Sequence, residues 1–297
     1  MRYVSSNSGI WLGCALQLAL GCANEIQGTG SLTIEISGEE AALSGYPVGS
    51  GASEIAFADG WTLDFRKVLV SLSHFELKTA GGDDADLESD SVVADLHPGD
   101  AELWRFDEVP ARRWDRVGYR YQPPSDGTRR VGGASQADVA LMRDEGYSFY
   151  IEGTARKGER EVEIAWGFPF AVQLSRCQNG LDETDGVVVR ENAQSSAQIT
   201  VHLDHLFFDN WAVDEPNLRF DAMAAVAPAD GPLLLSDLAK QNNLSDLKAA
   251  DGQPLDLAYD PGSAFSPVPT NLEQYTIEAA TTTGHWNGEG HCDYARQ

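Results

Sequence analysis

Alternating apolar and polar residues are the feature that most limits how this chain can fold. In residues 31–37 (SLTIEIS), Leu32, Ile34 and Ile36 are apolar, and polar side chains stand between them. Residues 61–79 alternate in the same way, with a bend or bulge expected near Lys67. Because successive side chains of a strand point to opposite faces, a period of two predicts strands that bury one face.

Similar patterns continue along the chain, separated by turn residues. We expect a hairpin of residues 147–156 and 161–170 around the turn 157–160, and shorter strands at 91–96, 115–121, 187–191 and 198–203. Residues 41–60 and 81–90 are expected to be loops. Helices are predicted from Ser135 to just before Gly146, where Ser135 and Asp138 form a capping box, within 235–241, and over 271–281 with Thr270 as cap.

Many short strands and few helices predict a mainly β fold. We expect an antiparallel β-sandwich with short helical insertions, formed by residues 31–297. An alternative division into two smaller β domains near residues 125–135 stays open, because Pro123-Pro124 and Gly132-Gly133 lie there.

The segment Leu18-Ala19-Leu20-Gly21-Cys22 follows a short apolar run and resembles a bacterial lipobox. The run is too short to span a bilayer as a helix, which needs about 20 residues. The resemblance implies a signal peptide over residues 1–21, lipidation of Cys22 and a tether over residues 22–30. It also implies an outer-membrane lipoprotein of the cell envelope that faces the periplasm. The alternative is ordinary cleavage near Ala23, which gives a soluble secreted protein.

The cysteines point to a cross-link. If Cys14 is removed with the leader and Cys22 is lipidated, Cys177 and Cys292 remain. A pair in an oxidising compartment predicts a disulfide that joins the C-terminal end of the chain to its middle. A pair of metal-ligating thiolates is the alternative.

The charge of the chain limits its partners. The formal net charge is −25, which opposes binding to nucleic acid and to anionic lipid headgroups. We therefore expect no nucleic-acid partner, contact with a membrane only through the lipid anchor, and a protein or glycan partner that the sequence does not identify.

Four of the six histidines lie in two short segments. His202 and His205 belong to the run ITVHLDH, and we place His202 and Asp204 on one face of a strand. His285 and His291 flank a glycine-rich loop, which a disulfide at Cys292 would hold in place. Imidazoles are ligands for Zn²⁺ and Cu²⁺, and neighbouring carboxylates orient them. We predict a copper or zinc site with His202, His205, His285 and His291 as ligands and with Asp204 and Glu289 beside them.

Other candidate sites are weaker. The acidic turns at residues 83–86 and 179–186 do not have EF-hand spacing and are interpreted as solvated loops. His74 and His97 stand apart from the clusters and are interpreted as structural. No nucleophile elbow, His-Glu-x-x-His helix or phosphate-binding loop occurs, so no catalytic residue is assigned.

Two resemblances bear on function. Residues 199–210, 218–225 and 284–295 resemble a pattern in uncharacterised secreted lipoproteins of environmental Gram-negative bacteria, where a His-x-Asp-His strand and a C-terminal Gly-His-aromatic-x-Gly-Glu-Gly-His-Cys segment occur together. Residues 65–77 (FRKVLVSLSHFEL) are more remotely similar to the early strands of methanobactin-associated periplasmic proteins. Those are cysteine-bearing β proteins linked to copper, and this favours copper over zinc.

Three functions remain open from the sequence. The first is a non-catalytic, lipid-anchored binding protein for a transition metal. The second is a structural or adhesive envelope module without metal. The third is a metallohydrolase, which needs an open coordination position and a general base, for which Glu289 is the candidate.

Overall fold

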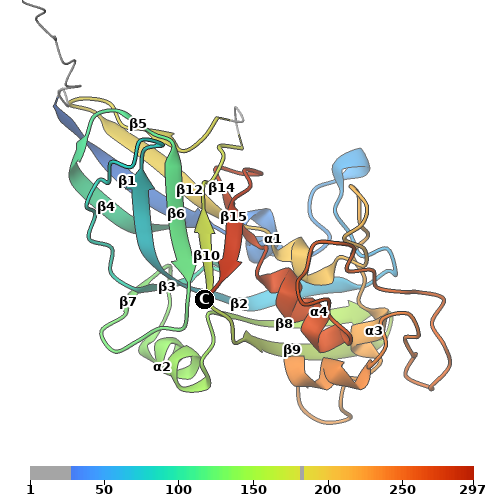
Figure 1. Ribbon diagram of the computed structural model, residues 1–297. Helices are drawn as coiled ribbons and strands as arrows, with labels where there is room; N and C mark the ends of the chain where they lie inside the picture. The colour runs from blue at the N-terminus through green and yellow to red at the C-terminus, as the bar shows by residue number, and fades with distance from the viewer. Residues whose placement is uncertain (1–27, 181–183) are drawn as a thin grey trace, which may run out of the picture.

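Layered β-sheets form the structure, a computed structural model that describes residues 28–180 and 184–297 (Figure 1). The predicted mainly β sandwich is confirmed, because two large sheets enclose a shared apolar core. The structure adds that three strand pairs are parallel, namely β1 with β12, β9 with β13, and β3 with β7. Within the described residues, no helix is long and apolar enough to cross a membrane.

The smaller of the two large sheets carries strands from both ends of the chain. Its strand order is β14 (Gly284–Trp286), β12 (Gln194–Val201), β1 (Thr29–Ser37) and β4 (Ala101–Pro110). Strand β1 contains the predicted segment 31–37 and buries Leu32, Ile34 and Ile36. The sheet therefore places the C-terminal β14 beside a strand from the middle of the chain.

The larger sheet is organised around one long strand, β2 (Thr62–Lys78). Its path is β13 (Leu233–Leu234), β9 (Arg160–Phe168), β8 (Phe149–Lys157), β2, β6 (Arg116–Tyr121), β10 (Val172–Ser175) and β15 (Asp293–Arg296); β3 (Val92–Asp95) pairs with β2, and β7 (Arg129–Val131) pairs with β3. A separate two-stranded sheet contains β5 (Arg113–Trp114) and β11 (Val187–Val188).

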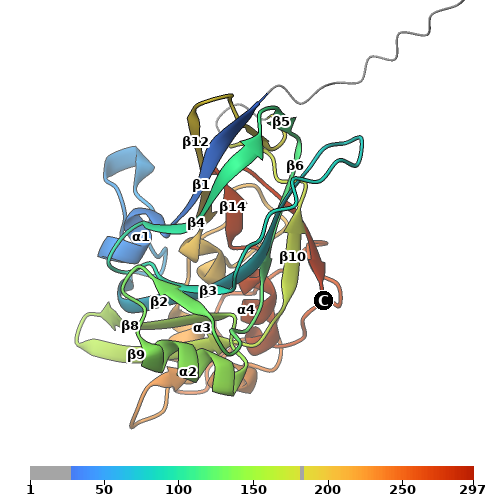
Figure 2. The same cartoon turned by 90° about the vertical axis from the view of Figure 1, so that its left-hand side faces the viewer.

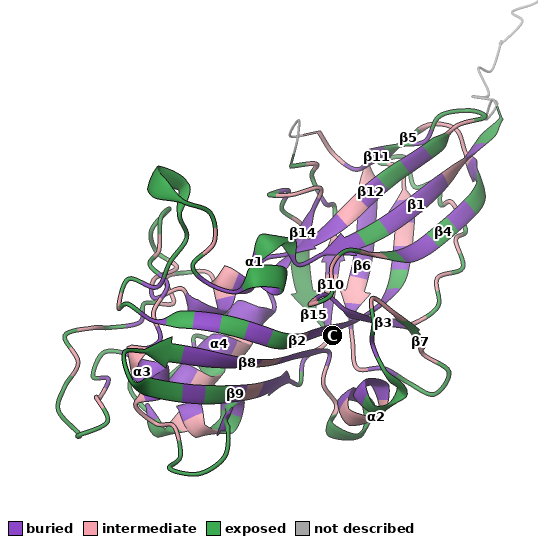
Figure 3. Cartoon of the chain, turned by 180° about the vertical axis from the view of Figure 1, so that it is seen from behind, coloured by how far each residue is buried: buried purple, intermediate pink, exposed green. Residues whose placement is uncertain are grey.

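Strand β2 is bent, as the sequence predicts. Its register against β8 shifts between Phe65 and Lys67, and its register against β6 shifts between Ser73 and Glu76. Extra residues at such bulges bend a strand and change its partner. Strand β2 thus pairs with β8 along its first part and with β6 along its last part. Figure 3 shows buried and exposed bands along the first part of β2, whereas residues 68–73 are all buried.

Aromatic side chains join the two sheets. Phe75 of β2 lies 5.7 Å from Trp104 and 5.5 Å from Phe106, both on β4, and 6.1 Å from Trp286 on β14, measured between ring centroids. Such offset and tilted contacts stabilise a core beyond the area they bury. Trp286 is fully buried and points into this core, although the sequence places it in a loop between candidate ligands.

The helices are short and lie around the sheets. They are α1 (Glu39–Ser44), α2 (Gln136–Glu145), α3 (Asp221–Ala224) and α4 (Leu272–Ala280), with 3-10 helices η1 (Gly51–Ser53), η2 (Leu203–Phe207) and η3 (Leu235–Lys240). Helix α2 lies beside β3, β2 and β8 (Figure 2), where Val139 and Met142 pack on Leu69 and Tyr150.

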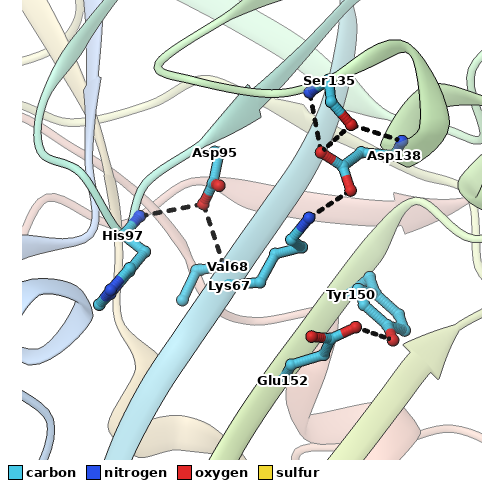
Figure 4. A network of polar contacts seen from close by, with 8 residues as sticks. All are labelled: Lys67, Val68, Asp95, His97, Ser135, Asp138, Tyr150 and Glu152. Atoms are coloured by element: carbon cyan, nitrogen blue, oxygen red, sulfur yellow. Dashed lines mark hydrogen bonds and ion pairs between the residues drawn. The ribbon is translucent and has the colours of Figure 1, made fainter.

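Helix α2 is also held by a polar network (Figure 4). The predicted capping box is present, because Ser135 Oγ accepts from Asp138 N and the Asp138 carboxylate accepts from Ser135 N at 2.8 Å. Lys67 Nζ, at the bulge of β2, donates to the same carboxylate. Burial raises the pKa of Asp138, but the hydrogen bonds from Lys67 and Ser135 outweigh burial and leave this pKa below its usual range.

Some local expectations were wrong. Strand β4 has no predicted counterpart, because charged residues interrupt the alternation around its buried Leu103, Trp104 and Phe106. Helix α1 and η1 occupy parts of the region 41–60 that was expected to be loop. Helix α4 is capped by Asn271, whose side chain accepts from Gln274 N at 2.9 Å, and not by Thr270.

The expected signal peptide (residues 1–21), Cys22 and most of the tether lie outside the described residues, as does part of the acidic turn 179–186. The other acidic turn, residues 83–86, is mostly exposed. Asp83 there pairs with Arg112, with 2.9 Å between carboxylate oxygen and guanidinium nitrogen.

Candidate metal centre

His285 stands on β14 and faces away from the main core. Strand β14 pairs with β12 so that His285 lies opposite Thr200 and Trp286 lies opposite Ile199. Since side chains alternate along a strand, Trp286 enters the core while His285 faces the other side of the sheet. His285 is only 4% exposed, and Tyr119 Oη donates to its backbone carbonyl at 3.2 Å.

His202 comes directly after β12, and the expected strand face there was wrong. Strand β12 ends at Val201, and residues 203–207 form the 3-10 helix η2 with His202 as its N-cap. Leu203, Leu206 and Phe207 are buried, a spacing of three and four residues that is typical of a helix. His202 and Asp204 therefore do not share a strand face, yet both line the same pocket.

The C-terminal segment returns to the site through a tight turn. Trp286 N donates to Gly290 O at 2.8 Å, so residues 287–289 form the turn and Glu289 projects from it. The predicted disulfide is present between Cys177 and Cys292. Beside the bond, Gln178 N donates to His291 O at 2.9 Å, and the segment after Cys177 lies against the turn. These contacts hold the segment that carries Glu289 and His291.

All four predicted histidines meet in this place. Between ring centroids, His202 lies 4.3 Å from His285 and 5.7 Å from His205. His285 lies 5.2 Å from His205 and 5.0 Å from His291. Two segments that stand far apart in the sequence thus form one imidazole cluster.

A compact group of ligand atoms lies within this cluster. His202, His285 and Glu289 each offer one ligand atom, and these atoms lie within 4.8 Å of one another. Bonds of about 2 Å from one ion to each ligand require such a spacing. Glu289, expected beside the ligands, is part of this group, whereas His205 and His291 stand around it.

The ring nitrogens of the buried histidines are poorly satisfied. His285 Nδ1 is buried and has no hydrogen-bond partner among the described residues. His202, only 6% exposed, has Nε2 at 3.5 Å from Gly288 O and 3.9 Å from Glu289 Oε2, and Nδ1 at 3.7 Å from Glu39 Oε2. Buried polar groups normally have close partners. His285 Nδ1 therefore lacks a partner among the described residues, and the contacts of the His202 nitrogens are long.

His205 differs from these two rings because one of its nitrogens already has a hydrogen-bond partner in the protein. Its Nδ1 lies 2.9 Å from Thr282 Oγ1, and that hydroxyl donates to Ala279 O at 2.8 Å. The Thr282 oxygen must then accept from Nδ1, which leaves the lone pair on Nε2 of the neutral ring. The ring is packed by Trp211 and Phe208, with centroids 5.2 and 5.0 Å away.

The environment keeps the His205 and His285 imidazoles neutral. Burial, followed by the neighbouring His202 and His291, lowers the pKa of His285 to about 3. Burial, followed by His285 and His202, also lowers the pKa of His205 well below its ordinary value. Metal ions bind neutral imidazole, so protons do not compete for these two rings near neutral pH.

Carboxylates surround the imidazoles. The pocket has a volume of about 460 Å³, and its lining includes Glu39, Glu40, Asp204, Asp214 and Glu289. No Lys or Arg occurs in the described lining. Burial raises the pKa of Asp204, and His202 opposes this shift. An acidic pocket around neutral nitrogen ligands attracts a cation.

Sequence reasoning missed Glu39. This residue has a φ of 54° and begins α1, so its carboxylate approaches His202 from the other side of the pocket. A positive φ at a residue other than glycine is uncommon and is found often at functional sites. In the sequence, the only indication of this position is the dipeptide Gly38-Glu39, which directly follows the alternating segment 31–37 and marks the end of that strand. No family model, curated protein or solved structure matches the chain.

Proposed function

We propose that this protein is a lipid-anchored, non-catalytic binding protein of the cell envelope that holds one copper or zinc ion. His202, His285 and Glu289 are the ligands, and the rings of His205 and His291 lie beside this set. Asp204 and Glu39 balance the charge. Cys22 carries the anchor, and the domain faces the periplasm.

One observation carries the metal proposal. His285 Nδ1 is buried without a partner, and the ring belongs to a group whose ligand atoms lie within 4.8 Å of one another. A buried, unpartnered polar atom costs about 1–3 kcal/mol. A metal bond to the imidazoles would offset that cost, whereas a purely structural role leaves it uncompensated.

The donor set favours a borderline or soft divalent ion. Two imidazoles and one carboxylate suit Zn²⁺ and Cu²⁺ better than Ca²⁺ or Mg²⁺, which require mainly oxygen ligands. At equal availability Cu²⁺ binds such sites more tightly than Zn²⁺. The sequence resemblance to copper-linked periplasmic proteins supports the same order.

Metal content and affinity test the proposal. We expect protein purified from detergent-extracted cell envelopes to contain one copper or zinc ion per chain by elemental analysis. Titration calorimetry of metal-free protein should give one site, and Glu289→Gln should weaken it about tenfold or more because it removes an anionic ligand. Glu289 is exposed, so this substitution leaves the core intact.

The matched control is Glu159→Gln, an exposed residue in the turn between β8 and β9. It removes the same charge away from the site and should bind metal like the wild type. Metal-free protein whose melting temperature does not change on addition of Cu²⁺ or Zn²⁺ would contradict the proposal. The structural or adhesive envelope module without metal would then be the better interpretation.

A metallohydrolase is the second candidate, and the pocket beside the ligands favours it. Three protein ligands leave a coordination position for water, as in catalytic zinc sites. Because Glu289 is now assigned as a ligand, the base in this version is Asp204 or Glu39. Hydrolysis of ester or peptide substrates by zinc-loaded protein, lost in Asp204→Asn or Glu39→Gln with metal still bound, would support it.

The anchor has its own test. Wild-type protein should partition into the detergent phase of a Triton X-114 extraction, and Cys22→Ser should move to the aqueous phase. Equal partitioning of both proteins would favour ordinary cleavage near Ala23. Failure of this test leaves the metal proposal unaffected.

A further inference from the structure

A second pocket is lined by residues of β5, β11, the start of β12 and the β14 turn. Figure 3 shows β5, β11 and β12 side by side at one end of the sandwich. Its volume is about 350 Å³. It is separate from the metal pocket, since the two share no described lining residue. They lie on either side of one turn, because Asn287 lines this pocket and Glu289 lines the other.

The described lining of this pocket is positively charged, in contrast to the chain as a whole. The chain contains 46 acidic and 21 basic residues. The described lining nevertheless contains Arg113 and Arg190 and no Asp or Glu. The remaining polar groups are amides and hydroxyls, from Asn179, Thr184, Gln194, Ser195, Ser196 and Asn287.

Neither guanidinium group forms an ion pair with a carboxylate among the described residues. The side chain of Arg190 makes no hydrogen bond or ion pair with any of them. Arg113 donates to neutral acceptors, namely the Asp185 carbonyl at 2.7 Å and Thr184 Oγ1 at 3.5 Å. A guanidinium without a carboxylate partner offers a planar pair of donors for an oxyanion.

Neutral groups of β12 and of the β14 turn add to the site. Ser196 is exposed and lines the pocket, whereas the Oγ of the neighbouring Ser195 is buried on the other face of β12. Asn287 continues the pairing along the edge of β12 that β14 covers. Its N donates to Gln198 O and its Oδ1 accepts from Gln198 N, both at 2.8 Å. Beyond Gln198, no described strand pairs with this edge of β12 at Ser196. The backbone groups of Ser196 that face this edge therefore lack a strand partner.

We propose that this pocket binds a small hydroxylated molecule that carries a carboxylate or phosphate. The two arginines hold the oxyanion, and Ser196 and the Asn287 side chain hydrogen-bond to the hydroxyl groups. A volume of about 350 Å³ is suitable for one sugar-sized ligand. The inference does not depend on a metal, because the two pockets are separate.

A comparison with another arginine-lined pocket supports the choice. The pocket beside α2 is lined by Arg129, Arg130 and Arg143. Arg129 is paired with Asp90 at 2.7 Å, and Arg143 is paired with Asp144 at 2.8 Å and with Asp126 at 3.1 Å. Only Arg130 lacks an ion-pair partner there among the described residues. Its exposed guanidinium provides a matched control.

Titration calorimetry on metal-free protein tests the proposal, since an added acid then has no ion to bind. The probes are D-glucuronate, D-glucose and inorganic phosphate. We expect glucuronate to bind one site with a Kd on the order of 1 mM, typical of so few atoms. Glucose should bind at least about tenfold more weakly. Phosphate binding without glucuronate binding would assign the oxyanion to a phosphate ester.

The variants locate the site. Arg190→Gln should weaken binding about tenfold or more, because the charge-assisted bonds are lost, while Arg130→Gln should leave it unchanged. Both residues are exposed, so both proteins should fold. The proposal is overturned if neither acid binds, if glucose binds as tightly as glucuronate, or if Arg130→Gln and not Arg190→Gln removes binding.

Discussion

Breaking the disulfide between Cys177 and Cys292 should reduce both stability and metal affinity. The two cysteines are 115 residues apart. In the chain-entropy model, a cross-link over such a loop raises the free energy of unfolding by about 5 kcal/mol, and measured effects are usually about 2–4 kcal/mol. Domains are typically stable by about 5–15 kcal/mol, so the reduced protein should still fold at 25 °C.

The effect on the site follows from what remains after reduction. The hydrogen bond from Gln178 N to His291 O and the pairing of Ser175 with Asp293 still connect the two segments. Strand β15, however, is an exposed edge strand. The turn that carries Glu289 and His291 therefore becomes less ordered, and metal binding must order it again. We expect an affinity about tenfold lower in the reduced protein.

Urea unfolding followed by tryptophan fluorescence, with and without dithiothreitol, measures the stability change in the same chain. Calorimetry with Zn²⁺, the redox-inert ion, measures affinity, and in these titrations tris(2-carboxyethyl)phosphine replaces dithiothreitol because the thiolates of dithiothreitol bind Zn²⁺. The double variant Cys177→Ala/Cys292→Ala gives an independent value, which includes the packing lost at the buried Cys177. Equal urea midpoints for oxidised and reduced protein would refute the stability argument. Lower stability with unchanged metal affinity would refute the link between the disulfide and the site.

Three further predictions concern particular side chains. Asp138→Asn should lower the free energy of unfolding by about 1.5–3 kcal/mol in urea titrations, because Lys67 loses its charged partner. An unchanged urea midpoint would show that the Lys67–Asp138 ion pair does not stabilise the fold. Since the folded-state pKa of Asp138 is lowered, its contribution is present above the unfolded pKa of about 4 and is lost as the pH falls through the folded-state value. The difference between wild type and Asp138→Asn should therefore shrink below about pH 4, and a constant difference would contradict this assignment. Gly180→Ala should weaken both folding and metal binding, because its Cβ would lie 2.6 Å from Asn287 O and 2.7 Å from Glu289 N. Gly81→Ala is the control and should match the wild type in both assays, because the nearest atom to its Cβ, Thr79 Oγ1, is 3.6 Å away.

Much of the fold could be predicted because burial follows strand periodicity. Strands β1 and β9 and the two ends of β2 alternate in sequence, and their buried faces form the core. Strand β8 and residues 68–73 of β2 do not show this pattern, because both of their faces are buried. The bulge near Lys67 and the cap at Ser135 also left local signals. The pairing of strands that are distant in the sequence left no such local signal. The parallel contact of β1 with β12 depends on how the whole sheet is assembled, which no local pattern contains.

The histidines of the site could be predicted from the sequence, but the positions of its carboxylates could not. The spacing of His202, His205, His285 and His291 identified a cluster, and the structure brings these side chains together. The position of Glu289 depends on the tight turn at residues 287–289, and that of Glu39 depends on a backbone with positive φ. Both depend on tertiary contacts, so sequence spacing could not rank them as ligands.

The pairing of β14 with β12 has a consequence for the order of events during folding. His285 reaches His202 only after Gly284–Trp286 has paired with Ile199–Val201 of β12, which leave the ribosome much earlier. Contacts between such distant segments form slowly and late. If the ion binds as proposed, it stabilises only chains whose C-terminal strand has docked. Metal loading would then act as a final check on assembly and selectively protect finished molecules from proteolysis.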